Sequence, residues 1–284
     1  MRAHDFARQA RPRSHSGGAA VAAGVESMGW FTKWRRARVL RRATLDERSW
    51  HSIVERYGFT RSLPAADRAR LRDWVVLFLD RKAVVAAGGL ELTDEMRLCI
   101  AVQACMLILN LDIDYYRDWV EVIVYPGEFV AEFEYMDEFG VAHRVEEPMS
   151  GESWLAGPVI LSWEDAALRG GEHGYNVVIH EFAHKLDMLN GDANGFPPLH
   201  ADMDRSEWSG AFGEAYEDFG NRVRSGAPLA IDPYAAETPA EFFAVLSEAF
   251  FEIPAKVRAE YPRVYAQLAA FYRQDPAARS DPLP

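Results

Sequence analysis

One stretch of the sequence has residue types at a spacing that could bind a metal ion and activate water. Residues 177–189 read VVIHEFAHKLDML and contain His180, Glu181 and His184 in an H-E-x-x-H pattern. The stretch contains no Gly or Pro and its apolar residues recur at helical spacing, so we expect a helix. Residues four apart lie on one face of a helix, so the two histidines could bind one cation through two imidazole nitrogens.

The glutamate between the histidines suggests hydrolysis. Glu181 is turned by about 100° from His180 around the helix axis, so it is poorly placed to bind the same cation. It could instead accept a proton from a water that the cation activates. Two imidazoles without a redox-specific ligand suit Zn²⁺, and we predict one zinc ion per chain. The alternative is that both histidines are purely structural, and the i, i+4 pair enclosing a glutamate argues against it.

The third protein ligand of the zinc must come from another part of the chain. No G-x-x-H follows His184, which excludes a third histidine of that type. The remaining possibilities are acidic residues on predicted downstream helices: Glu207, Glu214, Glu217, Glu241 and Glu248. Glu241 also has a structural explanation, because Thr238-x-x-Glu241 with Pro239 forms a capping box. Spacing alone leaves the choice open, with Glu207 as the second candidate.

One further acid lies close to the motif. Asp187 comes one helical turn after His184. We predict that it orients a histidine rather than binding the metal. A solvated acid on the helix surface explains its presence equally well.

The elements that position these residues form helices, then a small sheet, then helices. Apolar periodicity predicts helices at 71–85 and 94–111, and Thr93 is expected to cap the second. Runs of β-branched residues predict strands at 120–125 and 157–163 and a hairpin of 129–135 and 141–145. Helical segments are predicted again from 175 to 272. This order predicts an α+β fold that is mostly helical, with a small mainly antiparallel sheet.

Composition limits the class of protein. The 284 residues are 49% hydrophobic and carry a net charge of −12, which fits a globular protein and argues against direct binding of nucleic acid. No apolar run is long enough for a membrane span. Cys99 and Cys105 lie in an apolar stretch and are predicted to be buried thiols, so we expect a cytoplasmic protein.

We expect one domain over residues 28–275. Residues 1–27 are rich in Arg, Ala, Ser and Gly, and we interpret them as a disordered arm or an over-long start. Residues 276–284 are predicted to be a frayed tail. Residues 30–42 are basic and contain three aromatic residues, a pattern that could contact an anionic surface or form an ordinary solvated helix.

Three segments together resemble the Mlc titration factor A family. They are SGESWLAGPVILSW (150–163), IHEFAHKLDMLNGDANG (179–195) and IDPYAAETPAEFFAVLSE (231–248). The resemblance covers about residues 50–275. Members of this family are bacterial gluzincin-type zinc metallopeptidases related to the lethal factor peptidase core, so the resemblance implies a zincin-like fold with the H-E-x-x-H helix at its active site.

The resemblance also implies roles for individual residues. By position, His180, His184 and Glu241 bind zinc and Glu181 is the general base. Tyr234 belongs to the site, where a phenol hydroxyl could stabilise the oxyanion. Without the resemblance, Tyr234 is better explained as a loop residue that packs its ring.

Substrate and partner follow from the resemblance as expectations. We expect an aminopeptidase whose peptide substrate lies along an edge strand, for which Gly157, Pro158 and Val159 begin the predicted strand. The family also binds a transcription repressor of the Mlc type that controls sugar uptake. The alternative function is a repressor-binding regulator with little or no peptidase activity.

Overall fold

The computed structural model describes residues 30–127, 129–136, 142–149, 151–153, 157–168 and 174–279. The predicted arm at 1–27 and the last five residues lie outside this description. The helices of the first half are α3 (Trp30–Arg42), α4 (Glu47–Arg56), α5 (Gly58–Arg61), α6 (Ala65–Arg81) and α7 (Asp94–Leu107), followed by the 3₁₀ helix η1 (Ile113–Tyr116). Thr93 caps α7 as predicted, because its Oγ1 accepts a hydrogen bond from the Met96 N–H.

The second half is almost entirely helical. Its elements are α8 (Trp163–Ala166), α9 (Val177–Asp187), η2 (Met188–Asn190), α10 (Arg205–Ser225), η3 (Pro233–Ala236), α11 (Pro239–Glu252), α12 (Pro254–Glu260), α13 (Pro262–Tyr272) and α14 (Pro276–Arg279). The chain is therefore still ordered after residue 275. Pro276 and Ala277 are buried, and the Ala277 N–H donates to the Tyr265 hydroxyl, so the predicted frayed tail is wrong for residues 276–279.

The main sheet is largely parallel, and the prediction of a mainly antiparallel sheet is wrong. Its strands run in the order β1 (Ala83–Ala86), β2 (Glu121–Tyr125), β6 (Val159–Ser162) and β5 (Gly151–Ser153). β1, β2 and β6 are parallel, and only β5 is antiparallel to its neighbour. The sequence pattern had assigned residues 83–85 of β1 to the preceding helix. Helix α7 returns the chain between β1 and β2, which is the connection that parallel strands require.

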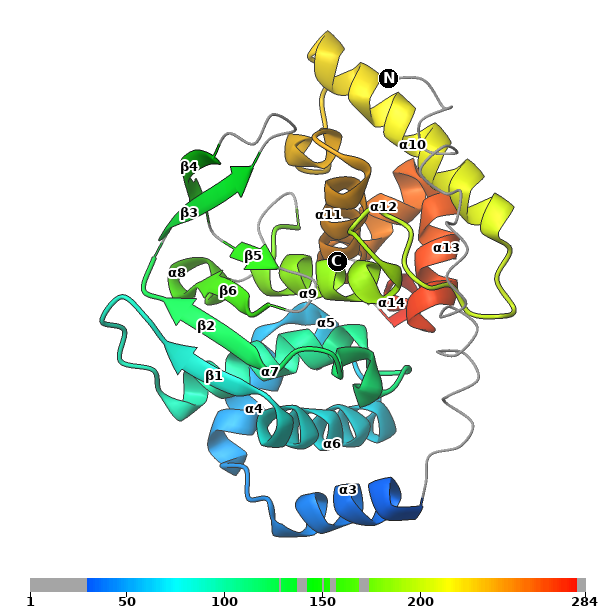
Figure 1. Cartoon of the computed structure of the whole chain (residues 1–284). Coiled ribbons are helices and arrows are strands. Elements are labelled where there is room, and N and C mark those ends of the chain that lie inside the picture. The colour runs from blue at the N-terminus through cyan, green and yellow to red at the C-terminus, as the bar shows by residue number, and fades with distance from the viewer. Residues whose placement is uncertain are drawn as a thin grey trace.

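The predicted hairpin is confirmed as a separate two-stranded unit. β3 (Phe129–Met136) pairs with β4 (Ala142–Met149) in antiparallel register, with Phe129 opposite Met149 and Met136 opposite Ala142. Figure 1 shows this hairpin above the end of the main sheet. The sequence therefore predicted correctly the two strands that are neighbours in the chain and pair with each other.

Helix α9 crosses the middle of the molecule, between the sheet and the C-terminal helices (Figure 1). Its buried anchor is Phe182, which contacts three aromatic rings from α6, η1 and the segment before β2 at centroid distances of 5.2–5.8 Å: Phe78, Tyr116 and Trp119. The helix is thereby fixed in rotation about its own axis. Because Phe182 is half a turn from His180, the core side of α9 and the histidine side are opposite faces.

The core is one continuous cluster that extends from α4 to α14. Both cysteines belong to it as buried free thiols, as predicted. Among the helices that the structure describes, none combines the length and the apolar character that crossing a bilayer requires.

Candidate metal centre

The start of α9 is set by a side-chain cap. The Asn176 Oδ1 accepts a hydrogen bond from the Ile179 N–H at 3.0 Å, so the helix begins at Val177, the first residue of the apolar run. His180, Glu181 and His184 then follow in regular helix and are all buried. The predicted stacking of the two histidines holds, because their ring centroids lie 4.8 Å apart.

Helix α11 brings Glu241 to the histidines. Its N-terminus is capped by Thr238, whose Oγ1 accepts from the Glu241 N–H at 3.1 Å, with Pro239 in the first turn. The Glu241 carboxylate is directed to α9, with its Oε2 at 2.9 Å from the His180 Nε2. The backbone of Glu241 thus belongs to the cap and its side chain to the cluster, so the two explanations of this residue are compatible.

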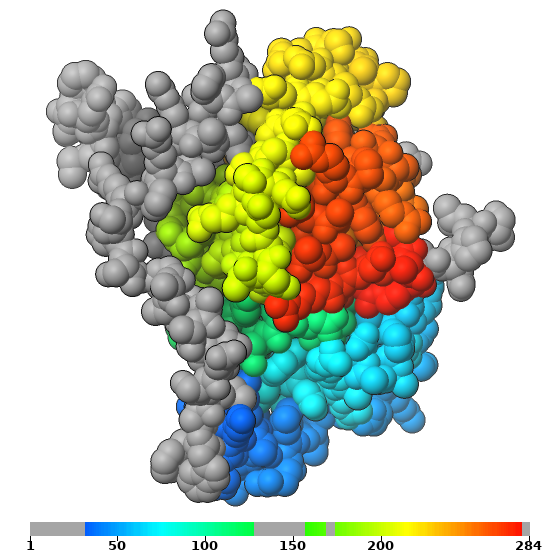
Figure 2. All heavy atoms as spheres, turned by 90° about the vertical axis from the view of Figure 1, so that its right-hand side faces the viewer, coloured from blue at the N-terminus to red at the C-terminus, as the bar shows by residue number. Residues whose placement is uncertain are grey.

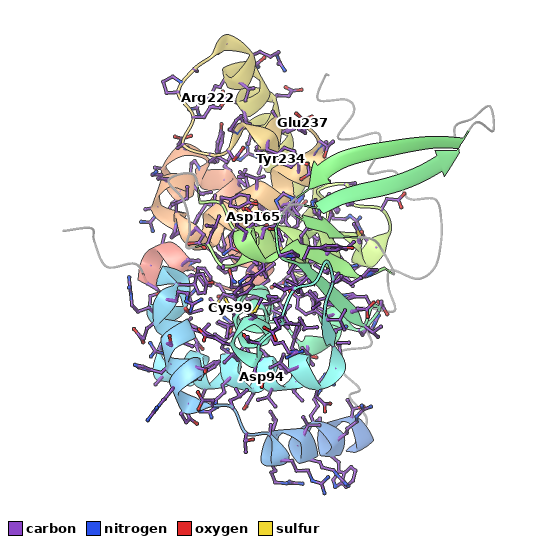
Figure 3. The ribbon with its side chains drawn as sticks, turned by 90° about the vertical axis from the view of Figure 1, so that its left-hand side faces the viewer. Asp94, Cys99, Asp165, Arg222, Tyr234 and Glu237 are labelled. Atoms are coloured by element: carbon purple, nitrogen blue, oxygen red, sulfur yellow. The ribbon has the colours of Figure 1, made fainter. Side chains whose placement is uncertain are left out.

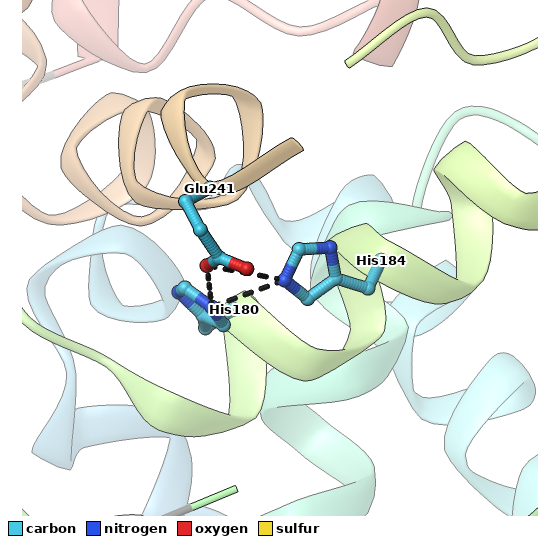
Figure 4. A group of neighbouring side chains, drawn as sticks. All are labelled: His180, His184 and Glu241. Atoms are coloured by element: carbon cyan, nitrogen blue, oxygen red, sulfur yellow. Dashed lines mark hydrogen bonds and ion pairs between the residues drawn. The ribbon is translucent and has the colours of Figure 1, made fainter. Parts of the chain in front are cut away.

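Three ligand-type atoms converge on one point (Figure 4). The His180 Nε2 and His184 Nε2 are 3.2 Å apart, and the Glu241 Oε2 is 2.9 Å from the first and 3.4 Å from the second. Ligands at about 2.0–2.2 Å from a tetrahedral Zn²⁺ are separated by about 3.3–3.6 Å. The cluster therefore matches the ligand separations of such a metal to within a few tenths of an ångström.

The protonation of His180 favours a cation at this point. Its Nδ1 lies 2.7 Å from the Glu248 Oε1, so the neutral tautomer with its proton on Nδ1 has a lone pair on Nε2 that can bind a cation. That lone pair faces the Nε2 of His184, an arrangement that a shared positive charge stabilises. Burial lowers the pKa of His180, but Glu241 and Glu248 outweigh it and raise the pKa well above its usual value.

The carboxylates respond in opposite ways to the same environment. Burial raises the pKa of Glu241, but hydrogen bonds and charge from His180 and His184 dominate and lower it. Glu181 has no such hydrogen bonds, and burial raises its pKa to about 7 against the attraction of the histidines. Its Oε2 is buried and has no hydrogen-bond partner within the described part of the chain. Glu181 is thus a carboxyl that can exchange a proton near neutral pH.

A buried hydrogen-bonded network lies behind His180, and sequence reasoning missed it. Glu248 accepts from the His180 Nδ1 through Oε1 and from the Asn176 N–H through Oε2. The Asn176 Nδ2 donates to the Glu252 Oε1 at 2.8 Å and to the Gln103 Oε1 at 2.9 Å. Glu248 had been considered only as a third metal ligand. The available signal was that Glu241, Glu248 and Glu252 share one face of the predicted helix.

Asp187 lies at the end of α9 and is buried. Its Oδ2 accepts hydrogen bonds at 2.7 Å from the backbone N–H groups of Asn194 and Gly195. In the described residues, neither its Oδ1 nor the His184 Nδ1 has a hydrogen-bond partner. Burial raises the pKa of Asp187 to about 6, while these N–H groups and His184 oppose the shift. Asp187 therefore anchors the loop after α9, and its predicted role toward a histidine stays a prediction.

Tyr234 lies at the entrance to α11 (Figure 3). It belongs to η3, where its N–H donates to the Asp232 Oδ1 at 2.9 Å. The Tyr234 ring centroid is 6.1 Å from that of His180, and half of its surface is exposed. The structure thus brings Tyr234 to the solvent side of the histidine pair.

The predicted edge strand is an interior strand. Val159 pairs with Val122 of β2 on one side and with Ser153 of β5 on the other, so its backbone cannot accept another strand. Gly157 precedes β6 and its carbonyl accepts a hydrogen bond from the Lys185 Nζ at 2.9 Å. In the described residues the outer strand of the sheet on this side is β5, which contacts α9 directly. The assignment of Gly157, Pro158 and Val159 to substrate pairing is therefore wrong for Val159 and is not supported for its two neighbours.

The other acids considered as ligands lie elsewhere. Glu207 is exposed in the first turn of α10, where its N–H donates to Asp204. Glu214 forms an exposed ion pair with Arg263. In the described part of the chain, only His180, His184 and Glu241 form a group of His, Cys, Asp or Glu side chains close enough together to hold one metal ion.

Comparison with known proteins agrees with this geometry. The sequence model of the family described as glucose-regulated metallo-peptidase M90 matches residues 31–273. The protein called Mlc titration factor A from Klebsiella pneumoniae subsp. pneumoniae is 36% identical over 219 residues, which cover 76% of this chain and 83% of that protein. The protein of the same name from Salmonella typhi is 39% identical over 223 residues, covering 77% and 83%. The chain belongs to the glucose-regulated metallo-peptidase M90 family.

Proposed function

We propose that the protein is a zinc-dependent peptidase with aminopeptidase activity. The observation that carries the proposal is the convergence of the His180 Nε2, the His184 Nε2 and the Glu241 Oε2 on one point beside a buried glutamate. These three residues would hold Zn²⁺, in keeping with a family of metallo-peptidases. When bound, the zinc supplies a Lewis acid that polarises the scissile carbonyl and lowers the pKa of a water.

Glu181 moves the proton in this mechanism. Its buried carboxylate, next to the two histidines, would accept a proton from the attacking water and return it to the leaving amine. The low-dielectric surroundings favour the transfer, because the neutral acid is the form that burial stabilises.

Tyr234 and β5 would bind the substrate. The position of Tyr234 on the solvent side of His180 suits a hydroxyl that donates to the carbonyl oxygen as negative charge develops there. Gly151–Ser153 of β5 is the outer strand of the sheet in the described residues and lies beside α9, so an extended peptide could add to it as a further strand. This edge replaces the strand that was predicted from the sequence.

The test compares wild type with Glu181→Gln. We expect about one zinc per chain in both proteins, and hydrolysis of an alanyl chromogenic amide that falls by about 10²–10⁴-fold in the variant. Substantial turnover by the zinc-loaded variant would contradict the role of Glu181. The proposed peptidase activity would be contradicted if the wild-type protein bound no zinc. It would also be contradicted if the zinc-loaded wild type hydrolysed no short peptide.

A second proposed function is binding of a transcription repressor of the Mlc type in the cytoplasm. It is supported by the name of the relatives, Mlc titration factor A, and by the two free thiols, which suit a reducing compartment. Repressor binding requires a surface and not a proton acceptor. We therefore expect Glu181→Gln to bind a purified Mlc-type repressor as wild type does. Loss of binding in this variant would show that repressor binding and peptide hydrolysis use the same site.

A further inference from the structure

Helix α3 is an unusual element of an acidic protein. It carries six cationic and no acidic residues in 13 positions, whereas the whole chain has a net charge of −12. Five of the cations are exposed: Lys33, Arg35, Arg38, Arg41 and Arg42. The sixth, Arg36, is buried. The helix therefore has a strongly cationic outer surface and one inward-facing arginine.

Arg36 fixes the direction in which that surface faces. Its guanidinium donates to both carboxylate oxygens of Asp112, at 2.7 and 3.0 Å, and forms an ion pair with Asp114 at 2.9 Å. Trp34 and Arg38 are each two residues from Arg36, which is about 200° around the helix. Holding Arg36 inward thus turns Trp34 and Arg38 outward, and Trp34 is 47% exposed with the Arg38 guanidinium 5.4 Å from its ring.

A hollow of about 560 Å³ lies between α3 and α6. It is lined by three arginines, Arg35, Arg38 and Arg42, by four aliphatic side chains, Val39, Leu45, Val76 and Leu79, and by one carboxylate, Asp80. Three guanidinium groups beside four aliphatic side chains suit an amphiphile whose head is anionic. A purely polar anion would leave the aliphatic side chains unused.

Helix α3 also occupies one end of the molecule. Figures 1 and 2 show it at the end opposite to α10, with the other helices to one side of it. Residues 51–284 carry 20 Lys and Arg against 39 Asp and Glu, so most of the protein is repelled by an anionic surface. A flat anionic surface that contacts only the α3 end is attracted by the cations of this helix. The acidic groups of the other residues lie farther away, and charges beyond about 8 Å are screened at physiological ionic strength.

From these observations we propose that α3 docks the protein on an anionic phospholipid bilayer. Arginines with an exposed tryptophan are the residues that interfacial helices use, the arginines for anionic headgroups and the tryptophan for the headgroup level. A nucleic acid would use the cations but neither Trp34 nor the aliphatic side chains that line the hollow. The metal centre lies away from α3, so docking leaves the entrance to α11 open to solvent (Figure 1).

The test uses the full chain and sedimentation with vesicles. Wild type should bind phosphatidylcholine vesicles that contain phosphatidylglycerol, release them at high salt, and bind pure phosphatidylcholine vesicles weakly. The variant Arg38→Gln/Arg41→Gln/Arg42→Gln should bind about 100-fold more weakly, and Trp34→Ala several-fold more weakly with its charge unchanged.

A matched control removes three cations from helices that lie away from α3 (Figure 1). Arg224→Gln/Lys256→Gln/Arg258→Gln changes α10 and α12 by the same net charge, and we expect its vesicle binding to stay within about twofold of wild type. Equal loss in the control would overturn the proposal, as would absence of wild-type binding to the anionic vesicles. Binding of wild type to duplex DNA but not to vesicles, lost in the α3 variant, would assign α3 to nucleic acid instead. Unchanged peptide hydrolysis and melting temperature in all three variants separates this result from the proposed peptidase.

Discussion

The two sides of the His180 ring differ in how their polar groups are satisfied. Behind the ring, Glu248, Asn176 and Gln103 form a continuous buried network in which each side chain has a hydrogen-bond partner. In front of it, two imidazole nitrogens face each other at 3.2 Å, and the Glu181 Oε2 has no hydrogen-bond partner in the described residues. Buried polar atoms are normally paired, and leaving one unpaired costs about 1–3 kcal/mol. The difference indicates that the rear network holds the ring in place, and it supports the proposal that the front binds a cation.

The largest expected effect comes from removing the front carboxylate. Glu241→Ala should lower zinc affinity by about 100- to 1,000-fold, because one ligand contributes roughly a quarter of the 10–16 kcal/mol typical of a zinc site. Isothermal titration of the EDTA-treated protein measures this. Glu207→Ala is the matched control, since Glu207 is exposed on α10. Equal loss of zinc affinity in both variants would contradict the assignment of Glu241 as a zinc ligand.

The next effect concerns the other front residue. Tyr234→Phe should lower kcat for the alanyl amide by about 100-fold with little change in KM, as loss of one oxyanion donor does. Zinc content should not change, and the free energy of unfolding should stay within about 0.5 kcal/mol because the side chain is half exposed. An unchanged kcat would show that Tyr234 only packs beside His180.

A weaker effect is expected behind the ring. Glu248→Gln can satisfy either the His180 Nδ1–H or the Asn176 N–H as an acceptor but not both, so zinc affinity should fall by about 10–100-fold. Zinc titration against Glu252→Gln sharpens the comparison, because Glu252 belongs to the same network but does not contact His180. Equal affinities in the two variants would contradict a positioning role for Glu248.

The smallest effect is a pH dependence of stability. Burial raises the pKa of Glu252 to about 7 despite its hydrogen bond from Asn176. A carboxyl whose pKa is higher in the folded protein binds more protons there than in the unfolded chain, so stability falls as pH rises from about 4.5 to 7. In EDTA, urea unfolding should show wild type losing about 2 kcal/mol more than Glu252→Gln over this window. Parallel pH profiles would exclude a protonated Glu252.

What the sequence predicted correctly depends on local pattern. The helix that carries His180 and His184 and the hairpin of β3 and β4 follow from periodicity and turn residues within short stretches. The parallel sheet was missed because β1 has only four residues and its partner β2 lies beyond a helix. Val159 was placed at an edge because β5, with three residues, has no detectable alternation.

The candidate site shows the same limit. H-E-x-x-H identified His180, Glu181 and His184 from adjacent residues, whereas spacing alone could not choose among the downstream acids. Glu241 and Glu248 acquire different roles only because α11 packs on α9, which places the first before the His180 ring and the second behind it. This difference depends on how the two helices pack against each other, and the spacing of residues in the sequence does not reveal it.

The most direct test of the front side is anomalous diffraction at the zinc edge from crystals of the zinc-loaded protein. We predict one strong peak per chain, about 2.0–2.2 Å from the His180 Nε2, the His184 Nε2 and the Glu241 Oε2, with the Glu248 Oε1 still on the His180 Nδ1. A peak at other residues, or none at this cluster with zinc in excess, would contradict the account.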